Sequence, residues 1–396
     1  MKILPWWRKY PCLARISVLL ITVTLIPAMM GCDTAPDYLE IRNWHDLYAI
    51  RDNLGGHYLL MNDIDSNTSG YGEFANRAAN QGKGWQPIGT SNDPFTGSFD
   101  GQGYEIGDIF INRPDQSQVG LFGTLDVGGV IQNIKVVNAD VAGDWAVGDL
   151  VGENWGEVRN SYSDGAVTGV DCVGGLVGGN AGGVSNSYSA ANVAGHWDVG
   201  GLVGCIDSRG SVTNSYSIGD VNGEWAVGGL VGGNLGGIVT KSYSTSGVNG
   251  DDYVGGLVGD NQGTVSNSYS IGSVTGEWYV GGLVGDNDSL GIVSNSYASG
   301  SVTGYSFVGG LVGANWGAVN NSFWDINTSG MNESDGGTGK TTAAMQDVAT
   351  FTNVATKGLD NPWNIIAVAP DETNHAFIWN IVTEQTYPFL SWQPAS

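Results

Sequence analysis

The stretch Val199-Gly200-Gly201-Leu202-Val203-Gly204 decides the fold, because the same six residues return along the chain at nearly constant spacing. The block also begins at Val173, Val227, Val254, Val280 and Val308, with the variants VGDLVG at Val147 and VGLFG at Val119. Consecutive block leucines are 26 to 29 residues apart. Self-similarity at such a period indicates a repeat architecture, in which stacked copies bury one continuous core.

Two further segments of each repeat also favour β-strands. One reads Val-x-Asn-Ser-Tyr-Ser, as at Val265–Ser270, and the other has a valine before x-Gly, as at Val274. In the first, alternation places Val265, Asn267 and Tyr269 on one face and the serines on the other, as in a half-buried strand. A helix is excluded, because the pattern lacks a 3.6-residue period and glycine supplies 64 residues. We expect an all-β fold, a parallel β-helix (β-solenoid) of three strands per coil with small α/β end caps.

Two columns of residues follow from stacking the repeats in register. An asparagine four residues after the block leucine forms an expected structural ladder at a coil corner, where its amide can bond the next copy. A tryptophan two residues before the block valine forms an aromatic row, interrupted by Asp171 and Asp252 and followed by Ser306. Either the row stacks on itself and stabilises the solenoid, or it is a ligand-binding platform for sugars. The ladder is Asn154, Asn180, Asn234, Asn261, Asn287 and Asn315, and the row is Trp145, Trp197, Trp225 and Trp278.

The pattern VGGLVGxNxGxVxNSYSxGxV resembles the GLUG motif, which occurs in tandem in large bacterial and archaeal surface proteins and beside some IgA-cleaving metallopeptidases. Copies run from about residue 119 to residue 323, just over half of the chain. The resemblance implies a secreted or cell-surface protein with an adhesive role. It implies no activity, because no catalytic residue belongs to the motif. The right-handed sense of the helix is taken from the family of wide three-strand coils.

The ends of the chain differ from the repeats and divide it into four parts. Residues 1–32 form an expected signal peptide, with a basic start, a short apolar run and a lipobox-like Gly31-Cys32 that makes Cys32 a candidate lipid-attachment site. Residues 33–118 are an expected N-terminal cap with irregular first coils, including a helix that Asn43 caps. The repeats follow at 119–323, and 324–396 are an expected C-terminal capping region with a helix at 341–348.

Outside the leader the only cysteines are Cys172 and Cys205. If the repeats stack in register, Cys205 lies above position 179, seven residues along the coil from Cys172, or about 23 Å at strand spacing. A disulfide needs Cα atoms within about 7 Å. We therefore expect two buried thiols and no disulfide.

The net charge of −24 argues against nucleic acid and anionic lipid as partners, because both require a positive surface. The segment Gly336–Thr342 resembles a phosphate-binding loop, but Ser334 stands where that loop needs glycine. The four histidines form no zinc-peptidase motif, and no metal ligand set is evident. No motif supports calcium binding, so we expect no cofactor.

These observations predict no catalytic residues and no enzyme. We expect an exported, surface-located solenoid that binds an extracellular glycan or protein surface, with membrane contact only through an N-terminal lipid or an uncleaved leader. One alternative is a carbohydrate-active β-helix enzyme, with Arg159 beside Glu157 or Arg209 beside Asp207 as candidate groups. The other alternative is a passive cell-envelope spacer.

Overall fold

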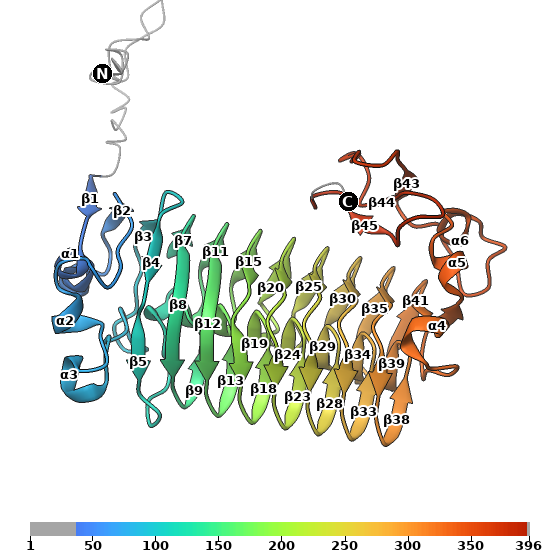
Figure 1. Ribbon diagram of the computed structural model, residues 1–396, viewed down its shortest axis with the longest axis horizontal. Coiled ribbons are helices and arrows are strands. Elements are labelled where there is room, and N and C mark those ends of the chain that lie inside the picture. The colour runs from blue at the N-terminus through green and yellow to red at the C-terminus, as the bar shows by residue number, and fades with distance from the viewer. Residues whose placement is uncertain (1–36, 394–396) are drawn as a thin grey trace, which may run out of the picture. The chain divides into compact units, whose positions relative to one another are not determined.

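The computed structural model describes residues 37–393, of which residues from Leu39 onward belong to one compact unit. The expected signal peptide and Cys32 lie outside the described residues. Successive coils stack along one axis (Figure 1), and neighbouring strands in the coils pair in parallel. The predicted β-solenoid is confirmed. No helix of the described part combines the length and the apolar character that crossing a membrane requires.

The coil has four faces, and each face contributes strands to one long sheet. We call these sheets A to D. Sheet A has 11 strands: β1 (Tyr38–Ile41), β2 (His57–Leu60), β3 (Ser98–Asp100), β7 (Val130–Gln132), β11 (Glu157–Arg159), β15 (Gly183–Ser185), β20 (Ser211–Thr213), β25 (Ile238–Thr240), β30 (Thr264–Ser266), β35 (Ile292–Ser294) and β40 (Ala318–Asn320).

Sheet B has 16 strands and carries the tyrosines of the repeat. They are β4 (Glu105–Gly107), β5 (Phe110–Asn112), β8 (Lys135–Ala142), β12 (Tyr162–Thr168), β16 (Tyr188–Ser189), β17 (Asn192–Ala194), β21 (Tyr216–Ser217), β22 (Val221–Asn222), β26 (Tyr243–Ser244), β27 (Val248–Asn249), β31 (Tyr269–Ser270), β32 (Val274–Thr275), β36 (Tyr297–Ala298), β37 (Val302–Thr303), β41 (Phe323–Asp325) and β42 (Thr338–Lys340).

Sheets C and D are formed by the two halves of the six-residue block. Sheet C has eight strands: β6 (Phe122–Leu125), β10 (Val151–Asn154), β14 (Val177–Asn180), β19 (Val203–Asp207), β24 (Val231–Leu235), β29 (Val258–Asn261), β34 (Val284–Asn287) and β39 (Val312–Asn315). Sheet D has seven: β9 (Trp145–Val147), β13 (Asp171–Gly174), β18 (Trp197–Gly200), β23 (Trp225–Gly228), β28 (Asp252–Gly255), β33 (Trp278–Gly281) and β38 (Ser306–Gly309).

The β-solenoid has five short strands in a regular coil and not the expected three, because the block and the Asn-Ser-Tyr segment are each divided into two strands. In the coil quoted at the outset, β18 ends at Gly200 and β19 begins at Val203, so the chain turns between them. A Cβ atom at Gly200 would collide with the carbonyl oxygen of Val203. The glycine is therefore required by the turn.

The third glycine of the block lets sheets C and D approach one another closely. A Cβ atom at Gly178 would overlap the backbone of Ala146 and Val147, and one at Gly204 would overlap the backbone of Cys172 and Val173. Each glycine of sheet C thus lies against the sheet D strand of the preceding coil. The valines and leucine that flank these glycines point into the core and are fully buried, as for Val199, Leu202 and Val203.

The Asn-Ser-Tyr segment is a corner, so the alternation expected from its sequence is broken. Asn267 has a φ of 50°, the left-handed conformation that asparagine tolerates well. After this corner Ser268 and Ser270 point inward and are fully buried, whereas Val265, before it, is buried on the same interior side. The tyrosine therefore faces away from the core, opposite to the valine with which it was grouped.

The two ends are closed by short helices and irregular segments. The N-terminal end carries α1 (Trp44–Ala49), a 3-10 turn (Ile50–Asp52), α2 (Tyr71–Phe74) and α3 (Ala79–Gly82). The predicted N-cap is confirmed: the side chain of Asn43 accepts hydrogen bonds from the backbone of His45 and Asp46. Beyond the repeats lie α4 (Ile326–Ser329), α5 (Thr342–Met345), α6 (Ala349–Thr352) and a small sheet of β43 (Ile365–Ala367), β44 (Trp379–Ile381) and β45 (Phe389–Leu390).

Candidate binding surface

Sheets C and D meet along one edge of the solenoid, and their side chains pair across it. The residue before each sheet D valine has a positive φ, as at Cys172 (50°) and Asp198 (48°). Cys172 faces Cys205 of the next coil, and a Cβ atom at Gly233 would touch the carboxylate of Asp198. One side chain from sheet D therefore meets one from sheet C in the following coil.

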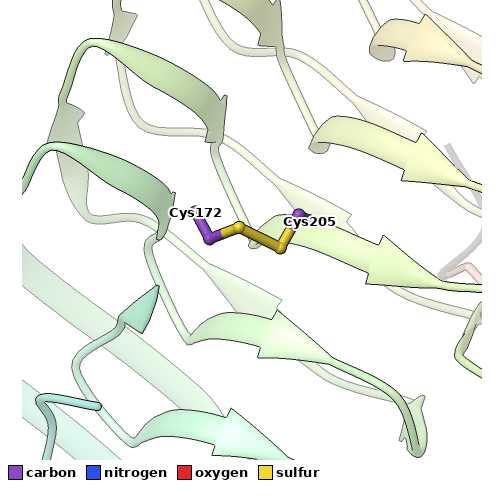
Figure 2. The surroundings of a disulfide bond; sticks show 2 residues. All are labelled: Cys172 and Cys205. Atoms are coloured by element: carbon purple, nitrogen blue, oxygen red, sulfur yellow. A yellow bond between two sulfur atoms is a disulfide. The ribbon is translucent and has the colours of Figure 1, made fainter. Parts of the chain in front are cut away.

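Cys172 and Cys205 form a disulfide, which corrects the prediction of two free thiols. Their Cα atoms are 5.1 Å apart, and the bond joins β13 to β19 (Figure 2). The separation of Cys172 and Cys205 that was expected from the sequence was a distance along the path of the coil. The chain turns back at Gly174-Gly175-Leu176, so Cys172 lies across from sheet C. It is therefore far closer to Cys205 than the path along the coil suggests.

A hollow of about 520 Å³ opens beside the disulfide, and we call it the Trp145 hollow. Sheet D contributes Trp145, Asp171 and Asp198, and sheet C contributes Glu153, with the disulfide between them. Trp155, Asp207 and Leu235 stand at the ends of the sheet C strands. Among the described residues that line it there is no Lys, Arg or His.

The hollow exists because one coil has small side chains where its neighbours have large ones. Gly179 pairs with Glu153 on one side and Cys205 on the other. Ala181 stands at the repeat position that Trp155 and Asp207 occupy in the adjacent coils. The nearest atoms to a Cβ built at Gly179 are 3.8 to 3.9 Å away, so this glycine leaves open space.

Two carboxylates of the hollow, Asp171 and Asp198, lie in an environment that opposes their negative charge. Burial, followed by the charges of Asp171 and Asp260, raises the pKa of Asp198 to about 7. Burial also raises the pKa of Asp171. One carboxylate oxygen of Asp171 is buried and has no hydrogen-bond partner within the described part of the chain. A cation in the hollow would stabilise the ionised carboxylates and give the unpartnered oxygen of Asp171 a partner.

The same carboxylates belong to a group that could contact a metal ion. Asp171, Cys172 and Asp198 bring one donor atom each within 4.8 Å of one another. The sulfur of Cys172 is already bonded to Cys205, so it is not a thiolate ligand. Two carboxylates remain, fewer than the six to eight oxygen ligands that calcium takes.

The tryptophan row runs along the outer edge of sheet D. Strand pairing places Trp145 and Trp197 on either side of Asp171, and Trp197 directly beside Trp225. Trp197, Trp225 and Trp278 are exposed, by 50%, 44% and 39%. No ring contact between two members of the row is found in residues 37–393; Trp225 instead meets Tyr253 edge-on at 5.4 Å. Trp278 likewise meets Tyr305 at 5.7 Å. The row is therefore partly exposed and does not stack on itself.

The asparagine ladder lies inside the corner between sheets C and A. The amide of Asn261 donates to Asn287 at 2.7 Å, and Asn287 donates to Asn315 at 2.7 Å. Asn154 and Asn234 donate to Asn180 and Asn261 in the same way. All but Asn315 are buried, so the ladder is part of the scaffold, and one member, Asn180, also lines the Trp145 hollow. Its members do not have positive φ; that conformation belongs to the asparagine of the Asn-Ser-Tyr corner.

A column of stacked tyrosines on the outside of sheet B was missed by the sequence analysis. The rings of Tyr162, Tyr188, Tyr216, Tyr243, Tyr269 and Tyr297 are 4.4 to 4.9 Å from their neighbours. Their faces are covered by one another, so only ring edges and hydroxyl groups point outward. The repeat of Tyr in the Asn-Ser-Tyr-Ser segment was the available signal, but its outward direction depends on the corner.

The C-terminal segment lies along this column. The indole of Trp363 donates to the carbonyl oxygen of Asn321 at 2.8 Å, and that of Trp392 donates to Lys241 at 3.0 Å. Tyr297 donates its hydroxyl to Pro388. Figure 1 shows β43, β44 and β45 beside the coils. The last coil is closed instead by residues 333–340, where Ser334 accepts from the backbone of Leu311 and Val312 and β42 pairs with β41.

Lys340 and Arg159, which the sequence analysis considered for phosphate binding and for catalysis, each donate a hydrogen bond within the scaffold. Lys340 belongs to Gly336–Thr342, the segment that resembles a phosphate-binding loop. It lies on strand β42 and donates a hydrogen bond to the carbonyl oxygen of Lys357. Arg159 donates to Gln132 at 2.8 Å. Neither arginine proposed as a catalytic group forms an ion pair with its expected carboxylate among the described residues.

Comparisons with known proteins agree with the repeat. The sequence model described as "The GLUG motif" matches residues 195–222 and 276–303. The chain is 38% identical over 149 residues to Halomucin of Haloquadratum walsbyi, covering 35% of this chain and 2% of that protein. It is 36% identical over 109 residues to a protein named as a candidate Gly-rich membrane protein of Evansella cellulosilytica, covering 27% of this chain and 12% of that protein.

A solved structure with a similar chain path is that of a candidate immunoglobulin A1 protease from Bacteroides ovatus. It shares 21% identity, with a TM-score of 0.48 over 71% of this chain and 83% of that one. The chain spans only a small part of the two curated relatives it matches. The motif matches fall on coils whose strands have been described above. The chain carries GLUG-motif repeats, and these repeats build its β-solenoid.

Proposed function

We propose that this chain is an exported, non-catalytic protein of the cell surface that binds an extracellular glycan along the C–D edge of its solenoid. The observation that carries the proposal is the open tryptophan row beside the acidic Trp145 hollow. Tryptophans buried only in part, with unstacked faces, offer the flat apolar contacts that sugar rings accept, while carboxylates accept their hydroxyl donors.

The surface location is supported by the leader and by the relatives. The first 32 residues have the basic start and apolar run of an export signal, with Cys32 as the proposed lipid-attachment site. One relative carries the name Halomucin, and the other is named as a Gly-rich membrane protein. The disulfide is also consistent with an oxidising compartment outside the cytosol.

The experiment incubates the mature chain with a panel of neutral and acidic polysaccharides and measures both retention and release of reducing ends. We expect retention without release. Product release would instead identify a carbohydrate-active enzyme, and neither signal would identify a passive spacer.

A matched pair of variants locates the binding. Trp225→Ala with Trp278→Ala removes two exposed members of the row, whereas Trp316→Ala removes an exposed tryptophan, 71% accessible, at the end of a sheet C strand. We expect the double variant to lose retention with its melting temperature held and the control to keep retention. A collapse of the melting temperature of the double variant would mean that the row is structural.

A further inference from the structure

We propose that the Trp145 hollow binds the protonated amine of an amino-sugar chain. This inference rests on the proposed function, because it names the class of glycan that the C–D edge takes. It concerns a different feature from the tryptophan row, namely the hollow and its charge.

The first argument is the charge of the lining. Glu153, Asp171, Asp198 and Asp207 all face the hollow, and no basic side chain of the described part lines it. Such crowding of carboxylates without a counter-charge is unfavourable in a partly buried site. The buried, unpartnered oxygen of Asp171 independently marks an unused acceptor. A positively charged hydrogen-bond donor would balance the charge of the carboxylates and also pair with the oxygen of Asp171.

The second argument is the combination of carboxylates with aromatic rings. Trp145 and Trp155 line the hollow from two different sheets. Trp is the side chain whose ring face attracts ammonium groups most strongly, and the attraction grows when water is excluded. The volume of about 520 Å³ is within the range of small-ligand sites, so a ring with its amine can enter.

The third argument favours a sugar chain over a basic peptide. Beyond Asp171 the row continues with Trp197 and Trp225 in successive coils. Coils are about 4.8 Å apart, so Trp197 and Trp225 place two flat rings in consecutive coils leading away from the hollow, before Asp252 interrupts the row. The successive sugar rings of a glycan can contact these tryptophan rings, whereas one lysine side chain would contact only the hollow.

The position that can close the hollow is Gly179. Its φ is not in the left-handed region, and although Gly233 and Ala314 are small, the equivalents in other coils include Glu153, Asp260 and Asp286. The solenoid therefore accepts large side chains at this position. Gly179→Leu should fill the hollow and keep the fold. Asp198→Asn is the second variant, because it keeps the shape and removes one carboxylate.

The test measures binding of two glucosamine oligomers of equal length, one fully deacetylated and one fully N-acetylated, by calorimetry at about pH 6.5, where amines keep a proton. We expect the deacetylated oligomer to bind the wild-type chain about tenfold more tightly. Gly179→Leu and Asp198→Asn should each reduce that preference, with melting temperatures that show a folded chain.

Other outcomes overturn the proposal in distinguishable ways. Equal affinity for the two oligomers, unchanged by Gly179→Leu, would reject the amine while leaving glycan binding intact. Tighter binding of a hexalysine peptide than of the deacetylated oligomer, abolished by Gly179→Leu, would assign the hollow to a basic protein partner. Binding of no glycan by the wild-type chain would reject the proposed function as well.

Discussion

Cys172 and Cys205 are bonded across the line where sheets C and D meet, and they tie one coil to the next at the wall of the Trp145 hollow. Neighbouring coils place other pairs at the equivalent positions, among them Ala146 with Gly179 and Ala226 with Asp260. The covalent pair therefore borders the hollow that the small residues Gly179 and Ala181 leave open.

Removing the disulfide should destabilise the chain without changing its fold. The bond closes a loop with a sequence separation of 33 residues, for which chain entropy predicts a contribution of about 3 to 4 kcal/mol. We expect Cys172→Ala with Cys205→Ala to lower the unfolding free energy by that amount in oxidising buffer and by almost nothing in reductant. Denaturant titration in both buffers checks it. Absence of the linked peptide from a non-reduced digest of the wild-type chain would contradict the bond.

Two adjacent glycines should respond differently to a methyl group. A Cβ atom at Gly178 would collide with the backbone of the preceding coil, whereas one at Gly179 would meet atoms only at ordinary contact distances of 3.8 to 3.9 Å. We expect Gly178→Ala to cost about 3 kcal/mol or more, because overpacking against backbone forces the sheets apart. Gly179→Ala is the control, with a change of about 0.5 kcal/mol or less. Equal melting temperatures of the two variants would argue against the close approach of sheets C and D.

Much of the fold was predictable because register follows from repetition. The block leucines and valines predicted the stacking, and the structure pairs Val199 with Val227 and Trp197 with Trp225 as the alignment of repeats requires. What could not be predicted depends on where the chain turns. Taking the block as one strand hid the return at Gly174-Gly175, and with it the proximity of Cys172 to Cys205.

The candidate site was predictable only in part for the same reason. The tryptophan row follows one sheet, so equal spacing along the sequence located it. The hollow needs Glu153 and Trp155 from sheet C beside Trp145 and Asp171 from sheet D. Its signal in the sequence is a pair of small residues, Gly179 and Ala181, at columns that carry larger side chains in adjacent coils. That signal has meaning only when the two sheets are known to meet.

A buried carboxylate in the first full block should make stability depend on pH. Asp149 replaces the second glycine of the block; it is fully buried, and neither carboxylate oxygen has a hydrogen-bond partner in the described chain. Burial raises the pKa of Asp149 well above its usual value. The native state therefore keeps a proton that the unfolded state loses above about pH 4, and stability falls as pH rises beyond that point.

Asp149→Asn should remove this dependence. We expect the variant and the wild-type chain to differ least near pH 4, and the advantage of the variant to grow by about 1.4 kcal/mol per pH unit until the folded pKa is reached. Denaturant titrations between about pH 4 and pH 8 measure it. The exposed Asp220→Asn serves as the control, and a parallel response of the two variants would contradict the burial of Asp149.

The C-terminal segment should be held to the tyrosine column by Trp392. Its indole donates to Lys241, its ring lies 5.8 Å from that of Tyr243, and Gln393 donates to Tyr269 at 2.7 Å. We expect Trp392→Ala to release the segment at a cost of about 1 to 3 kcal/mol, so that limited proteolysis cleaves after residue 380 faster than in the wild-type chain. Trp316→Ala should leave the cleavage rate unchanged. Unaltered cleavage of the Trp392 variant would show that the segment is held elsewhere.

The most direct measurement is a crystal structure of the chain grown with the deacetylated glucosamine oligomer. The account predicts one sugar ring in the Trp145 hollow, with its amine within hydrogen-bond distance of Asp171 or Asp198 and following rings along Trp197 and Trp225. An oligomer ordered on another face of the solenoid, or an empty hollow at saturating ligand, would contradict it.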